Sequence, residues 1–307
     1  MTTQQTARTQ YIEAANGTRF AYRRLGRTEG VPLVAHIHYR ANMDFWDPVL
    51  INALAAARPV VLFDQAGVGR STGEVPLTFE GWADNVIALA KALGLDQIDL
   101  LGFSMGGMAV QMVALSAPNL VRKLILAGTT ASQPSSSSVT GIVWPRETAP
   151  REPINLLSTA TTPQEVEDAL AYSFFYADDH GRAAAKAYWN RICERDVPGE
   201  PRILDLLDRN AAKRQYATSQ DWSKPNPQYS FDRLGELRMP VLVLNGDNDV
   251  LIPTSRSWEM VSRISRAQLI IYPKAGHGFL YQYADLVAKH VNMFLDRDDY
   301  GDLGSKL

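Results

Sequence analysis

Residues 100–108 read LGFSMGGMA and place one serine, Ser104, between Gly102 and Gly106. The residues before it, IDLLG (98–102), are typical of a buried strand, and MAVQMVALSA (108–117) is typical of a helix. A serine at such a sharp strand-to-helix turn is lifted above the sheet, and glycines flank it because side chains would collide with neighbouring backbone. The first amides of the helix favour negative charge at the same point. The stretch therefore predicts a nucleophilic serine rather than an ordinary turn residue.

Other apolar runs alternate with helical patterns on both sides of this turn. The segment YIEAANGTRFAYRRL (11–25) has the Asn-Gly signal of a hairpin. The later runs are VPLVAHIH (31–38), RPVVLFD (58–64), VRKLILAG (121–128), MPVLVLNG (239–246) and AQLIIYP (267–273). Short β-branched runs separated by helices predict an α/β fold with a mostly parallel, doubly wound sheet that is buried on both faces.

The pattern changes near residue 131, which predicts an insertion. A serine-rich stretch, ASQPSSSSVT (131–140), is followed by the helical segments TPQEVEDALAYSFFY (162–176) and GRAAAKAYWNRI (181–192). A chain of 307 residues suits one α/β domain that carries an insertion. We predict a core formed by 1–130 and 236–307, with a helical cap over 131–235.

Composition and charge limit the function classes. The 31 Lys and Arg residues nearly balance 33 Asp and Glu, without long runs of one sign, which argues against nucleic-acid or anionic-membrane partners and favours a small-molecule substrate. A single cysteine, Cys193, excludes an internal disulfide framework. The start, MTTQQTARTQ, lacks the apolar stretch of a secretion signal, so we expect a cytoplasmic protein. A homo-oligomer is left open.

A nucleophilic serine needs a base, and the base needs an orienting acid. Asp247 and Asp249 follow the strand in VLVLNGDNDVLIP (241–253), and His277 follows the strand in IIYPKAGHGF (270–279). Because each group follows a strand, all three functions meet at the carboxyl edge of the sheet. The chain order Ser, Asp, His is also the order used by enzymes with a strand-to-helix serine turn.

These residues resemble the α/β-hydrolase superfamily, in particular its serine esterase and cofactor-free haloperoxidase-like branch, over residues 10–297. The resemblance implies that the acid occupies the last position of a G-x-x-D setting, Gly246 to Asp249, and that Asp247 shapes the loop. FDQAGVGRSTG (63–73) is similar to the family's D-x-x-G-x-G-x-S stretch. It does not suit a dinucleotide, because Thr72 stands where the third glycine is required.

The family takes one oxyanion amide from the residue after the nucleophile, here Met105, and another from a His-Gly-X loop with a tryptophan nine residues after the histidine. Counting back from Trp46 makes Tyr39 the second donor and puts His38 in the glycine position. An alternative register, with His36 first, makes His38 the donor.

Two histidines on one face of the predicted strand, His36 and His38, invite a metal interpretation. No partner with ligand spacing accompanies them, so we expect no metal and no cofactor; His36 belongs to the core and His38 borders the site. The predicted substrate pocket is apolar and includes His38, Phe103, Phe174, Phe175 and Trp189.

The function expected from this pattern is a serine hydrolase that cleaves a small, largely apolar carboxylic ester or lactone through an acyl-enzyme. Ser104, His277 and Asp249 would be nucleophile, base and orienting acid. The same triad also supports C–C bond hydrolysis, perhydrolase chemistry, or a lyase or cyclase step, because the superfamily contains all of these. A ligand receptor with a vestigial triad is the alternative from another class.

Overall fold

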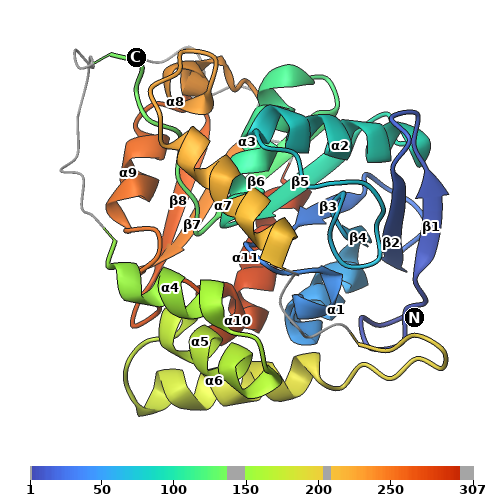
Figure 1. The fold of residues 1–307 in the computed structure, drawn as a ribbon. Helices are drawn as coiled ribbons and strands as arrows, with labels where there is room; N and C mark the ends of the chain where they lie inside the picture. Colours follow the sequence, from blue (N-terminus) through green and yellow to red (C-terminus); the bar gives the residue numbers. More distant parts are fainter. Residues whose placement is uncertain (1, 137–148, 203–208, 298–307) are drawn as a thin grey trace.

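An eight-stranded sheet forms the centre of the protein (Figure 1). The computed structural model describes residues 2–136, 149–202 and 209–297. The strand order is β1-β2-β4-β3-β5-β6-β7-β8; β2 is antiparallel to both of its neighbours and the other pairs are parallel. The strands are β1 (Gln10–Glu13), β2 (Arg19–Gly26), β3 (Leu33–His36), β4 (Pro59–Phe63), β5 (Ile98–Phe103), β6 (Val121–Ala127), β7 (Val241–Gly246) and β8 (Ala267–Tyr272). The predicted mostly parallel sheet is confirmed.

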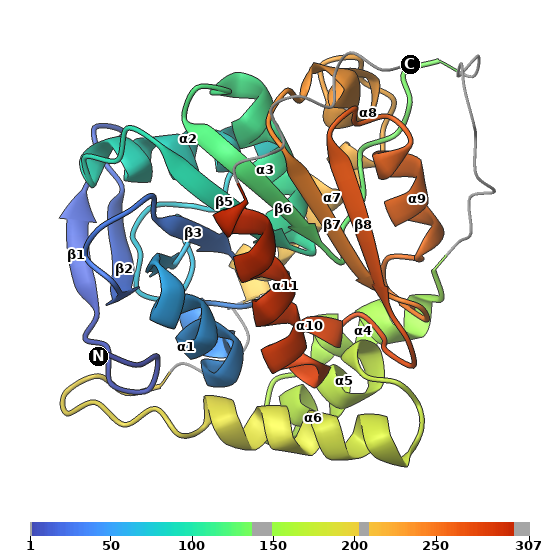
Figure 2. The ribbon, with the colours of Figure 1, turned by 180° about the vertical axis from the view of Figure 1, so that it is seen from behind.

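Helices cover both faces of this sheet, as Figures 1 and 2 show from opposite sides. On one face α1 (Pro48–Ala57) packs against α11 (Ala284–Asp296), and on the other α2 (Phe79–Ala92) packs against α3 (Met105–Ser116). Helix α9 (Ser255–Val261) contacts β7 and β8, and α10 (Phe279–Gln282) precedes α11. Among the described residues, no helix is long and apolar enough to cross a membrane.

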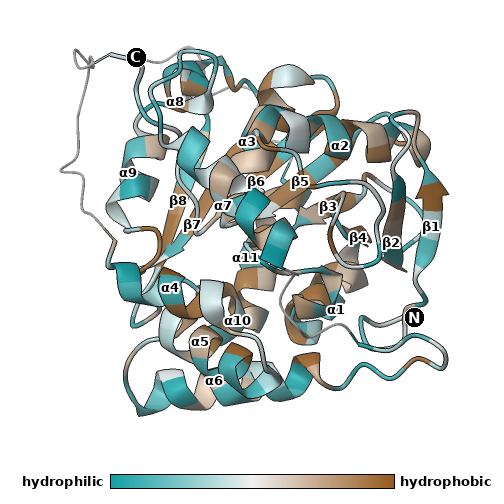
Figure 3. Cartoon of the chain, in the orientation of Figure 1, coloured by the Kyte–Doolittle hydropathy of each residue, from teal (hydrophilic) through white to brown (hydrophobic). Residues whose placement is uncertain are grey.

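The central strands are mostly apolar and are buried along their whole length, because both of their faces are covered. Every residue of β3, β5 and β7 is buried, and the sheet is the most hydrophobic layer in Figure 3. Burying one large aliphatic side chain stabilises a fold by roughly 1.5–3 kcal/mol. The two apolar layers therefore hold the sheet rigid, and its carboxyl edge is a firm base for side chains in the loops that follow the strands.

Between β6 and β7 the chain forms a group of helices beyond this edge. They are α4 (Arg151–Thr159), α5 (Pro163–Phe174), α6 (Asp179–Ile192) and α7 (Arg209–Trp222), followed by α8 (Ser230–Arg233). Helix α5 starts at a capping box in which Thr162 and Glu165 satisfy each other's backbone N–H groups, with Pro163 in the first turn. The two ends of the excursion are joined: Ser132 N–H donates to Ser230 Oγ at 3.2 Å, and Phe231 N–H donates to Ser132 Oγ at 3.0 Å.

The two histidines of the 31–38 segment do not share a strand face. Strand β3 ends at His36, and His38 lies in the loop beyond it, which corrects the predicted arrangement. The His36 ring stacks on Trp82 (5.5 Å between centroids) and meets the edge of Phe63 (5.1 Å). Burial lowers the pKa of His36 from 6.5 to about 4. His36 is thus a neutral core residue, held away from any site at the sheet edge.

His36 should make folding sensitive to acid. Between pH 6.5 and 4 the unfolded chain binds a proton at His36 that the folded chain does not, so the free energy of unfolding should fall as the pH drops through this window. The loss from His36 alone is about 2 kcal/mol at pH 5. Urea unfolding at several pH values should therefore show a shallower pH dependence in His36→Gln than in wild type. The exposed His180→Gln variant is the control, and a His36→Gln slope equal to that of wild type would contradict the assignment.

Candidate active site

Ser104 occupies a strained turn between β5 and α3. Its backbone has φ 57° and ψ −121°, a conformation that side-chain-bearing residues rarely adopt. Ser104 N–H donates to Ala127 O at 2.9 Å, and Thr129 Oγ1 donates to Ser104 O at 2.8 Å. A Cβ on Gly106 would lie 2.2 Å from His36 O. The turn therefore requires glycine beside the serine, as the sequence pattern predicts, and hydrogen bonds from the next loop keep it in place.

His277 and Asp249 form a buried, hydrogen-bonded pair. His277 Nδ1 lies 2.7 Å from Asp249 Oδ2, and both side chains are excluded from solvent. Because a carboxylate can only accept, this bond places the ring proton on Nδ1. His277 Nε2 is buried and has no hydrogen-bond partner in the described chain. His277 and Ser104 line the same pocket, so the unprotonated nitrogen is available there for a hydroxyl proton.

The two candidate acids make different bonds. Asp249 Oδ1 accepts the N–H groups of Leu251 and Ile252, which leaves Oδ2 for the imidazole. Asp247 instead accepts the N–H groups of Lys274 and Ala275. Asp247 thus holds the loop that carries His277, and only Asp249 touches the ring.

Tyr39 and Met105 both line the pocket beside Ser104. Met105 is the first residue of α3, where backbone N–H groups have no intrahelical acceptor. The amides of Tyr39 and Met105 donate no hydrogen bond within the described residues. Both amides are thus unused by the fold at the pocket wall, as an oxyanion site requires.

Positive φ in this loop falls at Arg40 (φ 55°), whereas the family resemblance implied conformational freedom at His38. Arg40 N–H donates to Gln215 Oε1 at 2.8 Å, and its guanidinium donates to Leu157 O at 2.7 Å and to Ala160 O at 3.2 Å. Arg40 therefore connects the loop to α7 and to the carboxyl end of α4. No sequence pattern indicates this role, because the contacts join residues more than 100 positions apart.

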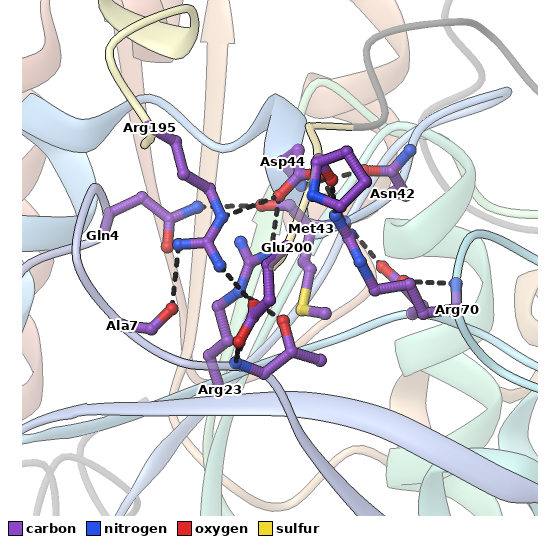
Figure 4. A network of polar contacts seen from close by, with 12 residues as sticks. Gln4, Ala7, Arg23, Asn42, Met43, Asp44, Arg70, Arg195 and Glu200 are labelled. Atoms are coloured by element: carbon purple, nitrogen blue, oxygen red, sulfur yellow. Dashed lines mark hydrogen bonds and ion pairs between the residues drawn. The ribbon is translucent and has the colours of Figure 1, made fainter. Parts of the chain in front are cut away.

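A buried charge network fixes the segment that follows this loop (Figure 4). Asp44 pairs with Arg23 on β2 at 2.6 Å and with Arg70 at 3.0 Å. Arg195, just beyond α6, lies 3.5 Å from Asp44 and pairs with Glu200 at 2.6 Å. Removing one partner of a buried ion pair leaves a charge uncompensated at a cost of roughly 3–5 kcal/mol. The network thus joins the sheet, the segment after β3 and the chain just beyond α6.

Asp64, the first residue of the D-x-x-G-x-G-x-S stretch, supports the same segment. Its carboxylate accepts the N–H groups of Met43 and Arg70, each at 2.8 Å. A Cβ on Gly69 would lie 2.3 Å from Asp64 Oδ2, which explains the glycine. Burial raises the pKa of Asp64 to about 6. This stretch is a structural support for the loop and not a phosphate-binding turn.

His38 borders the pocket in a neutral state. Its ring meets the edges of Phe103 and Phe174, with centroids 5.3 Å and 4.9 Å away. Nδ1 lies 2.9 Å from Tyr39 O, so Nδ1 carries the proton and Nε2 is a buried acceptor without a partner in the described chain. Burial lowers the pKa of His38 to about 3. The ring therefore stays uncharged at physiological pH.

The pocket has a volume of about 1150 Å³, large for a small-molecule site. Of the predicted wall residues, His38 and Phe174 line it. Phe103, Phe175 and Trp189 do not, and all three belong to the hydrophobic core; the prediction for them is corrected. The Phe103 ring packs against the His277 ring, with 4.9 Å between their centroids.

Helices α4 and α7 supply a part of the pocket wall that was not predicted from the sequence. The apolar residues of α7 are too sparse to mark it as a pocket-lining helix. In the described ranges, no group of three or more His, Cys, Asp or Glu residues could hold a metal ion.

Asp249→Asn should lower turnover by about 10⁴-fold, because the amide favours the wrong imidazole tautomer. Asp247→Asn keeps one acceptor oxygen for the 274–275 amides, so the turnover of this variant should stay within about tenfold of wild type. Steady-state kinetics of both variants, with the fold checked by near-UV circular dichroism, measures the difference. An inactive Asp247 variant beside an active Asp249 variant would reverse the assignment.

Comparison with known proteins places this geometry in a family. Residues 35–282 match the family model described as alpha/beta hydrolase fold. A solved α/β hydrolase fold protein from Chitinophaga pinensis is similar, with 30% identity, TM-score 0.83, and coverage of 96% of this chain and 99% of that one. A poly(3-hydroxyalkanoate) depolymerase of Ectopseudomonas oleovorans is 27% identical over 90% of this chain and 88% of its own length. A 2-hydroxy-6-oxononadienedioate/2-hydroxy-6-oxononatrienedioate hydrolase of Dechloromonas aromatica is 26% identical over 79% and 78%. The chain therefore belongs to the α/β-hydrolase fold family and is a hydrolase.

Proposed function

We propose that the protein hydrolyses carboxylic esters or lactones through an acyl-enzyme on Ser104. The observation that carries the proposal is the His277–Asp249 pair at 2.7 Å, whose free Nε2 shares a pocket with the strained serine. A hydroxyl is a weak nucleophile until a neighbouring base takes its proton. This arrangement supplies the base, its correct tautomer and the orienting acid.

In the proposed reaction, Ser104 Oγ attacks the substrate carbonyl while His277 Nε2 takes the hydroxyl proton. The tetrahedral intermediate collapses, and the imidazolium gives that proton to the departing alkoxide. His277 then deprotonates a water molecule, which attacks the acyl-enzyme; as the intermediate collapses, the imidazolium returns this proton to Ser104 Oγ and the carboxylic acid is released. Asp249 stays ionised throughout and stabilises the imidazolium.

The Tyr39 and Met105 amides would bind the oxyanion of the tetrahedral intermediate. One such donor is worth roughly 10² to 10³ in rate. The amides act without reorganisation only if the loop is rigid. Arg40, Asp44 and Asp64 supply that rigidity through the bonds described above.

C–C bond hydrolysis is the competing chemistry, since the Dechloromonas aromatica relative is named for a 6-oxo dienedioate. Such a reaction must protonate a carbon atom as its bond breaks. His38 is the additional imidazole beside the triad, but its single ring proton is bound to Tyr39 O and its pKa of about 3 keeps Nε2 unprotonated. The state of His38 therefore favours ester cleavage.

A fluorophosphonate probe tests the nucleophile, because only an activated serine reacts with it at an appreciable rate. Peptide mass spectrometry should locate the adduct on Ser104, and wild type should hydrolyse 4-nitrophenyl esters. Ser104→Ala should show neither reaction.

Two outcomes would overturn the proposal. One is an adduct at another residue of active enzyme. The other is a complete lack of labelling and ester turnover in folded wild type, which would indicate a receptor with a vestigial triad.

A further inference from the structure

The outer wall of the active-site pocket carries positive charge that the proposed ester hydrolysis does not require. The described lining residues include five Arg or Lys and no Asp or Glu: Arg40, Arg151, Arg209, Lys213 and Arg256. The whole chain has a formal charge of −2. The excess is therefore local and not a property of the surface in general.

Helix α7 presents part of this charge on one face. Arg209, Lys213, Tyr216 and Gln220 are spaced by four, three and four residues, which places them along a single stripe, and all four line the pocket. A helix that only covered the site would place apolar residues there. Arg151 lines the same pocket from the first turn of α4.

Three of the five pocket cations differ from other cations of these helices in having no ion-pair partner among the described residues. Arg151, Arg209 and Lys213 make no ion pair within the described part of the chain. By contrast, Arg214, their neighbour on α7, pairs with Glu74 at 3.2 Å and donates to Val75 O at 2.7 Å. Lys186 on α6 pairs with Glu167 at 2.7 Å. The other two of the five pocket cations have partners within the protein: Arg40 is bonded to α4, and Arg256 lies 3.4 Å from Glu259.

The inner part of the pocket is apolar. Met105 and Met108 line it next to Ser104, and the Phe174 ring lies 5.0 Å from that of His277. A substrate that fills both parts has an apolar segment next to the scissile carbonyl and an anionic group further out.

From these features we infer that the enzyme selects esters that carry a carboxylate or phosphate group at the far end of an apolar acyl chain. Arg209, Lys213 and Arg151 are the specificity-determining residues and bind this anion at the pocket mouth. The inference rests on the proposed ester hydrolysis and adds an anionic group to the small, largely apolar substrate expected from sequence.

Esters of equal acyl length that differ only in the terminal group test the inferred anion preference. The 4-nitrophenyl half-ester of suberic acid differs from 4-nitrophenyl octanoate in a terminal carboxylate, and the 8-aminooctanoate ester carries a cation instead. We expect wild type to have a higher kcat/KM for the suberate than for the octanoate, with the aminooctanoate lowest. Comparison with the half-esters of adipic and sebacic acid shows which acyl-chain length gives the highest kcat/KM. The 8-phosphonooctanoate ester shows which anion is preferred. Because exposed charges are screened by salt, the suberate advantage should shrink at high ionic strength.

Charge removal assigns the effect to residues. The suberate-to-octanoate ratio of kcat/KM should fall by roughly fivefold in Lys213→Gln, Arg209→Gln or Arg151→Gln, and by tenfold or more in the α7 double variant. Lys213→Glu should lower the ratio further. Lys186→Gln, on the cap but outside the pocket, should keep the wild-type ratio. Because these side chains are exposed, the variants should keep the stability of wild type, and thermal unfolding checks this.

The result separates this inference from the proposed function. If wild type hydrolyses the octanoate as well as or better than every anionic ester, or if the ratio is the same in all variants, the anion preference is refuted while ester hydrolysis stands. If neither ester is hydrolysed and no probe labels Ser104, the proposed ester hydrolysis is itself refuted, and the anion preference with it.

Discussion

The close packing of the first turn of α3 against the end of β3 is the constraint on which the site depends. With Gly106 next to His36 O, the Ser104 turn can adopt φ 57°, and the Ala127 carbonyl and the Thr129 hydroxyl hold it there. The turn places Ser104 and Met105, the first residue of α3, next to each other on the pocket wall. A side chain at Gly106 would separate the two elements and displace both residues together.

A second constraint acts on the segment that follows β3. This segment has little regular structure, so its rigidity comes from the bonds of buried polar groups, namely Asp64, Asp44 and Arg40. Such groups are costly to bury unless they are fully paired. Their pairing here links the conformation of this segment to the position of α4 and α6, because Arg40 bonds α4 and Arg195 joins the end of α6 to Asp44.

The sheet and the members of the candidate triad could be predicted from sequence because both depend on local order. Apolar runs define the strands, and Ser104, Asp249 and His277 each follow one of them. The roles of Arg40 and Asp44 could not be predicted, since their partners lie far away in the chain and no spacing marks them. The sequence also predicts Phe175 and Trp189 as pocket residues although both pack in the core, because an aromatic residue on a helix gives no sign of whether it faces a ligand or the core.

In the proposed reaction Ser104 and His277 act as one unit, and a double-mutant cycle measures this directly. If they do, Ser104→Ala and His277→Ala should each lower kcat by about 10⁶-fold, and the double variant should be no slower than either single variant. Losses that multiply in the double variant would show that the two residues act independently, and would contradict the proposed nucleophile–base pair.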